Sequence, residues 1–280
     1  PEIYTLSLHD ALPIFPVMSD WKKVRRILDG VYPAPVPPRD VVPAPGAKVP
    51  EGTKFIVLDT EYNPETLAVY MIGLAYWGDG PQPLSGEQVV VSTCDRALTK
   101  TRLYQLITHH PFVFHNALAD LRALHALFGF TPEMFLDIHD TIQEHVLLQS
   151  EWPHDLGFVE SLFSPHERMK HLGKNPHVRW SPAWWQQELD YNWGDCLTTG
   201  YAHKAMWAGL QRDPGSYRVY TEQNIPLINI RFKAKNRGVW LDRQFLHTLS
   251  GTLAERANTA LSVAQGYLGF PLNLGSDKQV

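Results

Sequence analysis

Four acidic side chains in three separate segments are the residues of this sequence best suited to chemistry. Asp59 and Glu61 lie in VLDTEY, Asp120 closes HNALAD, and Asp195 lies in YNWGDC. Carboxylate oxygens suit hard cations such as Mg²⁺ and Mn²⁺, which also bind phosphate oxygens. Without cations, two carboxylates about 4 Å apart repel each other by about 4 kcal/mol at an effective dielectric constant of about 20. Two divalent ions offset that charge, so the four residues predict a site for two-metal cleavage of phosphodiester bonds.

Each acidic segment taken alone also has a structural explanation. The first two carboxylates alternate with Thr60 and point to the same side of a strand, as they do at many solvated strand ends. Asn116 and Asp120 are four residues apart, which fits either neighbours on a helix or an N-cap followed by an exposed charge. Tyr191 and Asp195 have the same spacing, which also fits a surface pair. Their joint occurrence favours a metal site, with Tyr191 placed to orient a water molecule.

The elements that must position these side chains follow from the hydrophobic pattern. Runs rich in β-branched and aromatic residues predict strands over 54–59, 67–77, 88–93, 112–116 and 136–141. Helical spacing predicts helices over 96–110, 117–130 and most of 141–212, with a loop at 164–182. Three consecutive strands followed by alternating helices and strands predict an α/β fold, a mixed sheet flanked by helices.

The first 50 residues are expected to contribute little to this fold. Residues 1–15, PEIYTLSLHDALPIF, resemble a translated sequencing adaptor rather than part of the protein. Residues 21–32 form a short basic amphipathic segment, which fits either a solvated helix or a DNA-contacting element. Seven prolines between positions 33 and 50 exclude a helix or a central strand. They favour a disordered or extended linker.

Composition limits the class of protein. A chain of 280 residues with nine Trp and twelve Phe can form one large or two small domains. Its net charge of −4 gives no overall basic character, so binding to nucleic acid must depend on local patches and bound cations. Cys94 and Cys196 are too few for a disulfide framework or a thiolate zinc site, which fits a reducing compartment. The sequence has no apolar run long enough to span a bilayer, so we expect no membrane partner.

The three acidic segments resemble, in order and spacing, the three motifs of the DEDD superfamily of exonucleases. Tyr191, one helical turn before Asp195, is typical of the tyrosine subclass, because the position at which the histidine subclass carries His is Asp190. The resemblance covers about residues 53–212. It implies a ribonuclease-H-like sheet, 3′→5′ cleavage of single-stranded ends and release of nucleoside monophosphates.

The resemblance also implies roles for individual residues. The ligands of two divalent ions, Mg²⁺ or Mn²⁺, would be Asp59, Glu61, Asp120 and Asp195. Tyr191 would position the attacking water, and Asn116 matches a motif residue that implies contact with the substrate. After the first motif the chain reads YNPETLAVYM rather than the usual short Thr/Ser-rich turn. Within this segment, Tyr62 and Leu67 are the residues that we expect to contact the 3′ end.

The C-terminal segment resembles the opening of the polymerase domain of family A DNA polymerases. YRVYTEQNIPLINIRFKAKNRGVWLD matches a long helix followed by a Gly-Val/Ile-x-Leu-Asp turn, and LNLGSDKQV matches an Asn-x-x-Ser-x-x-Gln step. We expect a helix to about residue 236 and a left-handed Gly238 after it. A second helix is expected over about 243–266, with Asp242 as its cap.

These observations predict a proofreading 3′→5′ exonuclease of a family A DNA polymerase. Residues 51–213 would form the exonuclease domain and 214–280 a truncated start of the polymerase domain, without the polymerase active site. We expect a cytoplasmic monomer in a bacterial cell or phage-infected host. Its partners would be the single-stranded 3′ end of a primer-template and the rest of the polymerase chain. The alternatives are an RNase D-like exoribonuclease and a catalytically inactive exonuclease fold with a structural role.

Overall fold

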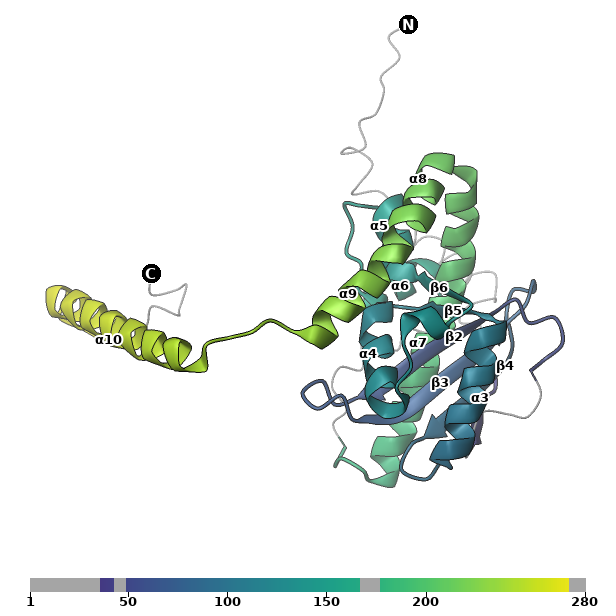
Figure 1. Cartoon of the computed structure of the whole chain (residues 1–280), viewed down its shortest axis with the longest axis horizontal. Helices are drawn as coiled ribbons and strands as arrows, with labels where there is room; N and C mark the ends of the chain where they lie inside the picture. Colours follow the sequence, from purple (N-terminus) through teal and green to yellow (C-terminus); the bar gives the residue numbers. More distant parts are fainter. Residues whose placement is uncertain (1–35, 43–48, 167–176, 272–280) are drawn as a thin grey trace, which may run out of the picture. The chain divides into compact units, whose positions relative to one another are not determined.

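The computed structural model describes residues 36–42, 49–166 and 177–271. The chain divides into two compact units, Pro1–Asn236 and Arg237–Val280. The first unit contains a six-stranded mixed sheet with helices on both faces (Figure 1). The second contains a single long helix within its described residues. The sheet and its flanking helices confirm the predicted α/β class.

The sheet has the order β1-β4-β3-β2-β5-β6. Its strands are β1 Asp40–Val42, β2 Phe55–Tyr62, β3 Val69–Trp77, β4 Pro83–Val90, β5 Pro111–Phe114 and β6 Asp137–Asp140. β2, β3 and β4 form an antiparallel meander, and β5 and β6 continue the sheet parallel to β2. β5 pairs with Ile56 and Val57 and ends at Phe114. The second half of β2 therefore extends past β5.

The helices begin mostly at side-chain caps. Their bounds are α3 Arg96–His109, α4 Ala117–Phe128, α5 Thr141–Leu148, α6 Leu156–Phe163, α7 Pro182–Arg212, α8 Pro214–Val219, α9 Ile225–Arg237 and α10 Arg243–Leu268. Two short turns accompany them, η1 Pro132–Met134 and η3 Tyr220–Asn224. Side chains of Asp95, Asp155 and Ser181 accept hydrogen bonds from backbone N–H groups in the first turns of α3, α6 and α7. Such caps satisfy donors that a helix leaves unpaired.

The two faces of the sheet have separate cores. Ile56 and Leu58 of β2 point into the larger core, which α3, α4 and α9 cover. Val57 points to the opposite face, where it packs with Trp193 of α7. Figure 1 shows α3 and α4 on one side of the strands and α7 on the other. Because side chains alternate along a strand, Asp59 and Glu61 lie on the face that α7 covers.

The Pro-rich segment contributes a strand that the sequence did not predict. Residues 40–42 were expected in an extended linker, but they pair in parallel with Glu87, Gln88 and Val89 of β4. β1 lies at the edge of the sheet, where neighbouring prolines are tolerated. Just before it, the carbonyl of Pro37 accepts a hydrogen bond of 2.9 Å from the indole N–H of Trp193. The linker interpretation is therefore wrong for this short stretch.

β4 also differs from its prediction, since it spans Pro83–Val90 rather than 88–93. Its first half, PLSGE, lacks the apolar run that marks a strand. Gly86 pairs with Ala75 of β3, and the ring of Trp193 lies against it. The glycine leaves room for the indole, so a residue that weakens the sequence signal is required by packing.

We predict that Gly86→Ala destabilises the fold. A methyl group at Gly86 would overlap Cη2 and Cζ3 of Trp193, a buried ring held between the sheet and α7. Overpacking of this kind lowers the free energy of unfolding by about 1–3 kcal/mol. Urea denaturation followed by tryptophan fluorescence measures the change. Gly80→Ala is the matched control, because its Cβ meets no atom within 4 Å; equal stability of the two variants would contradict the prediction.

The C-terminal helices agree with their local predictions. The helix expected after Pro214 is present as α8, η3 and α9, and Gly238 adopts the expected left-handed conformation with φ of 71°. Asp242 caps α10, accepting a 2.9 Å hydrogen bond from the N–H of Phe245. Tyr220 and Phe232 are buried, and the first compact unit ends at Asn236. The origin of 214–280 in a polymerase domain stays a prediction.

Some predicted features lie outside the described residues. These are the adaptor-like residues 1–15, the basic segment 21–32, part of the loop expected at 164–182, and the whole of LNLGSDKQV, residues 272–280. Among the helices that the structure describes, none combines the length and apolar character needed to cross a membrane.

Candidate metal centre

Asp59, Glu61 and Asp195 form a cluster, which we call the acidic cluster. One carboxylate oxygen from each residue lies within 4.8 Å of the others. β2 supplies the first two, and α7 supplies Asp195, which is buried. Three converging carboxylates are an oxygen donor set that suits Mg²⁺ or Mn²⁺. The structure therefore brings together three of the four acids that the sequence singled out.

The fourth acid, Asp120 of α4, is not among the three residues whose ligand atoms lie within 4.8 Å of one another, but it is held against Thr60 of β2. Its Oδ1 accepts hydrogen bonds from the N–H and hydroxyl of Thr60, at 2.8 and 2.6 Å. Thr60 lies between the two acids of β2, where the strand has passed the end of β5. Burial, and then the charge of Asp59, raise the pKa of Asp120 well above its usual range. A bound cation would stabilise this buried negative charge, so the donor set fits a divalent metal.

The structure agrees only in part with the two alternatives that the sequence left open for Asn116 and Asp120. It occupies the N-cap position of α4 but is left-handed, with φ of 68°, and its side chain makes no capping hydrogen bond. The helix begins at Ala117, so Asn116 and Asp120 are not helical neighbours. The side chain of Asn116 is exposed, whereas Asp120 is buried. Asn116 is therefore the N-cap residue by position, whereas the expectation of an exposed charge at Asp120 is wrong; a substrate contact by Asn116 stays a prediction.

The turn that starts α4 depends on Asp140. Its carboxylate accepts hydrogen bonds from the N–H groups of Asn116, Ala117 and Ile142, at 3.1, 3.0 and 2.9 Å. Burial raises the pKa of Asp140 to about 6.

We expect Asp140→Ala to lower the free energy of unfolding by about 2–4 kcal/mol, because it leaves buried donors unpaired. Urea denaturation measures the change. Asp155→Ala, which removes an exposed cap, is the control, and an equal loss there would contradict the prediction.

The remaining predicted residues are Tyr191 on α7, Tyr62 at the end of β2 and Leu67 in the turn after it. Tyr191 lies one turn before Asp195 on α7, so both side chains lie on the same side of the helix. Burial, and then the charge of Asp120, raise the pKa of Tyr62, which places its ring near the acids. Leu67 is left-handed, with φ of 57°, in the turn between β2 and β3. Contact of these three residues with a substrate stays a prediction.

A chain of hydrogen-bonded side chains supports Asp59, and the sequence did not reveal it. Asn192 donates to Oδ2 of Asp59 at 2.7 Å and accepts from the side-chain amide of Gln88 at 2.7 Å. Arg39 donates to Oε1 of Gln88 at 2.8 Å and pairs with Asp190 at 2.5 Å. Asn192 and Gln88 are both fully buried. The short segment before β1 thus contributes to the orientation of a predicted metal ligand.

A group of aromatic side chains lies around Tyr70 of β3. It consists of Tyr70, Trp180, Trp184 and Trp185, with ring centroids 4.7–6.2 Å apart. Tyr70 precedes Met71, the residue of β3 that pairs with Glu61, and burial, and then the charge of Glu61, raise the pKa of Tyr70. Trp180 is 50% exposed, and the guanidinium of Arg179 lies 4.6 Å from its ring centroid. An exposed ring beside a cation suits stacking with a nucleobase.

Comparison with solved structures identifies the fold. A nuclease solved in its apo form has a TM-score of 0.53 and 18% identity, over 71% of this chain and 93% of its own. NrnC from Brucella melitensis, solved with pGG bound, has a TM-score of 0.52 and 17% identity, over 73% and 95%. The catalytic core of RRP6 from Trypanosoma brucei has a TM-score of 0.51 and 18% identity, over 69% and 52%.

These likenesses establish the fold and not the activity, because the sequences are so different. They confirm the predicted ribonuclease-H-like architecture, a mixed sheet flanked by helices. No protein-family model matches the sequence, and no curated protein matches it either. The acidic cluster and its surroundings must therefore carry the functional conclusion.

Proposed function

We propose that this chain is a metal-dependent 3′→5′ exonuclease that hydrolyses the terminal phosphodiester bond of single-stranded DNA. The observation that carries this proposal is the convergence of Asp59, Glu61 and Asp195 within 4.8 Å, with Asp120 buried against Thr60, the residue between the two acids of β2. The fold shared with a protein described as a nuclease, and with NrnC solved with pGG bound, is consistent with it. The nearby aromatic group supports a single-stranded substrate, because unpaired bases are free to stack.

Each residue near the acidic cluster has a definable part in such a reaction. The four acids would hold two divalent ions, Mg²⁺ or Mn²⁺, which when bound stabilise charge on the phosphate and favour ionisation of water. Asn192 holds the carboxylate of Asp59, and Thr60 holds that of Asp120. The hydroxyl of Tyr191 orients the attacking water by a hydrogen bond. Trp180 stacks on a base and keeps the end of the strand in place.

The proposed biological role is proofreading within a family A DNA polymerase. The local structure around Gly238 and Asp242 supports this role, because both adopt the conformations expected from the polymerase-like sequence. The partners would then be a primer-template and the rest of the polymerase chain. An RNase D-like exoribonuclease is the second candidate, because the same set of acids can serve either nucleic acid.

Cleavage of labelled oligonucleotides tests the proposal. The chain is incubated with 5′-labelled single-stranded DNA, single-stranded RNA or a 3′-mismatched primer-template, with Mg²⁺ or with EDTA. We expect Mg²⁺-dependent shortening of DNA from the 3′ end and preferential removal of the mismatched nucleotide. Faster shortening of RNA would favour the second candidate. A metal-dependent rise in melting temperature without cleavage of any substrate would indicate an inactive exonuclease fold.

The aromatic group gives a prediction about substrate binding. Trp180→Ala should raise KM for single-stranded DNA by about 5- to 10-fold, the lower part of the range for loss of one stacked base, because the ring is half exposed. The kcat should change little, since the acids are intact. Initial rates over a range of oligonucleotide concentrations separate the two constants. Val178→Ala, at a neighbouring exposed position, is the control, and an unchanged KM for Trp180→Ala would exclude stacking there.

A further inference from the structure

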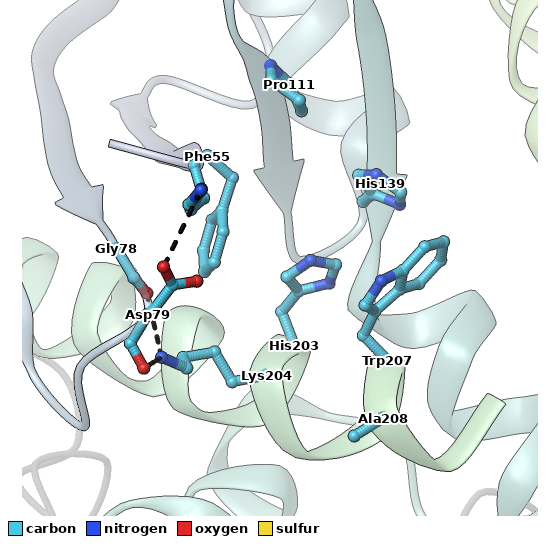
Figure 2. A pocket seen from close by; sticks show the side chains of 10 residues that line it. Phe55, Gly78, Asp79, Pro111, His139, His203, Lys204, Trp207 and Ala208 are labelled. Carbon is cyan, nitrogen blue, oxygen red and sulfur yellow. Dashed lines mark hydrogen bonds and ion pairs between the residues drawn. The ribbon is translucent and has the colours of Figure 1, made fainter. Parts of the chain in front are cut away.

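A second group of polar side chains lies at the other end of β2 from the acidic cluster. It borders a cavity of about 450 Å³ whose lining includes Phe55, His139, His203 and Trp207. Phe55 is the first residue of β2, whereas the acids lie near its end. Figure 2 shows the two imidazole rings and the indole of Trp207 grouped on one side of this cavity. The proposed exonuclease reaction makes no use of these residues.

The group contains a compact set of possible metal ligands. His139 of β6, Glu144 of α5 and His203 of α7 each offer a ligand atom, and these atoms lie within 4.8 Å of one another. All three residues are buried, with exposures of 8%, 0% and 4%. Because three separate elements supply them, the arrangement depends on the tertiary fold and not on a local motif.

One oxygen of Glu144 lacks a partner. Oε1 accepts hydrogen bonds from Nδ1 of His203 at 2.7 Å and from the hydroxyl of Tyr220 at 3.1 Å. Oε2 is buried and has no hydrogen-bond partner among the residues that the structure describes. A buried polar atom without a partner destabilises a fold by about 1–3 kcal/mol, and more when it is charged. A cation bound at this carboxylate would remove that penalty.

The surroundings of His139 fit metal ligation as well. Its Nε2 lies 3.4 Å from a carboxylate oxygen of Asp137, and its Nδ1 lies 3.3 Å from the hydroxyl of Tyr220, next to Glu144. A proton on Nε2, facing the carboxylate, leaves the Nδ1 lone pair on the side of the cluster, where it faces the hydroxyl of Tyr220. Metal-binding histidines commonly have such a carboxylate behind the ring, which fixes the tautomer.

We propose that His139, Glu144 and His203 bind a borderline divalent transition metal, with Zn²⁺ as the representative ion. Two imidazole nitrogens and one carboxylate suit Zn²⁺, whereas Mg²⁺ prefers an all-oxygen set. Coordination through Nδ1 of His203 would replace its hydrogen bond to Glu144, with the neutral imidazole keeping its single proton on Nε2. The cavity opens on both histidines and leaves room for water as a further ligand. This proposal does not rest on the exonuclease activity.

Zinc binding by the full chain tests the proposal. The protein is stripped with a chelator and titrated with Zn²⁺ in excess Mg²⁺, which occupies oxygen-rich sites. We expect one Zn²⁺ per chain, and affinity at least about 10-fold lower in His139→Gln and His203→Gln, since even residues behind a ligand change affinity 10- to 100-fold. His109→Gln, an exposed histidine of α3, is the matched control. Absence of bound Zn²⁺, or equal affinity in all three variants, would overturn the proposal.

Two further measurements make the result independent of variant folding and of the acidic cluster. Zinc-edge X-ray absorption of the unsubstituted protein should show imidazole ligands at about 2.0–2.1 Å, and a shell of oxygen atoms alone would overturn the proposal. The double variant Asp59→Ala, Asp195→Ala should bind Zn²⁺ as tightly as the unsubstituted chain. A large loss of affinity there would assign the bound Zn²⁺ to the acidic cluster instead.

Discussion

Replacing Asp59 or Asp195 by alanine is expected to slow hydrolysis of a DNA 3′ end by about 10²- to 10⁴-fold. Both carboxylates belong to the acidic cluster, whose ligand oxygens lie within 4.8 Å of one another. Removing either one weakens the binding of a divalent ion and removes several kcal/mol of transition-state stabilisation, on the order of 3–5 kcal/mol. Release of nucleotides from a labelled single strand at saturating Mg²⁺ measures the rate.

Two other variants define the specificity of that loss. Glu65→Gln removes an exposed carboxylate in the neighbouring turn and should leave the rate unchanged. Tyr191→Phe should reduce the rate less than the alanine variants, because the metal ligands remain. Thermal unfolding of each variant shows whether the fold is intact. If a folded Asp59→Ala or Asp195→Ala protein kept full turnover, the assignment of the acidic cluster as the active site would be refuted.

The sequence predicted the elements whose pattern is local. The strand that carries Asp59 and Glu61 begins with an unbroken apolar run, and the helix that carries Asp195 lies in the segment expected to be mostly helical, so both were found. Gly238 and Asp242 were also placed correctly, because a left-handed glycine and an N-cap depend on adjacent residues alone. Such features need no knowledge of what packs against them.

Features that depend on distant packing were not predicted. The first half of β4 contains Gly86, which looks unfavourable in a strand until the ring of Trp193, on a distant helix, is placed against it. Burial of Asp120 depends on the end of β5, which allows α4 to reach Thr60. β1 depends on its pairing with β4. No local spacing encodes these contacts.

The two groups of ligating residues differ in how far the sequence revealed them. The acids of β2 are two residues apart and Tyr191 is one turn from Asp195, so part of the geometry is visible in each segment. His139, Glu144 and His203 converge from three elements whose contact depends on the packing of α5 and β6 against α7. Their sequence neighbourhoods contain no comparable spacing, and only the assembled fold identifies them.

Asn192→Leu is expected to lower kcat/KM for DNA by about 10- to 100-fold, the usual effect of removing a residue that orients a metal ligand. Asn192 is fully buried and donates a 2.7 Å hydrogen bond to Oδ2 of Asp59. Leucine has a similar volume and cannot donate, so the carboxylate loses its fixed orientation. The substitution also removes the acceptor of the side-chain amide of Gln88. Initial rates over a range of Mg²⁺ concentrations measure the effect.

The Mg²⁺ dependence distinguishes orientation of the ligand from a general loss of structure. If Asn192 positions Asp59, the Asn192→Leu variant should need more Mg²⁺ for half-maximal rate, and excess Mg²⁺ should restore part of the activity. Loss of folded protein would lower the maximal rate without shifting that midpoint. Gln211→Ala, at an exposed position of the same helix, is the matched control and should behave as the unsubstituted chain. An unshifted midpoint in folded Asn192→Leu would show that Asp59 keeps its orientation without this hydrogen bond.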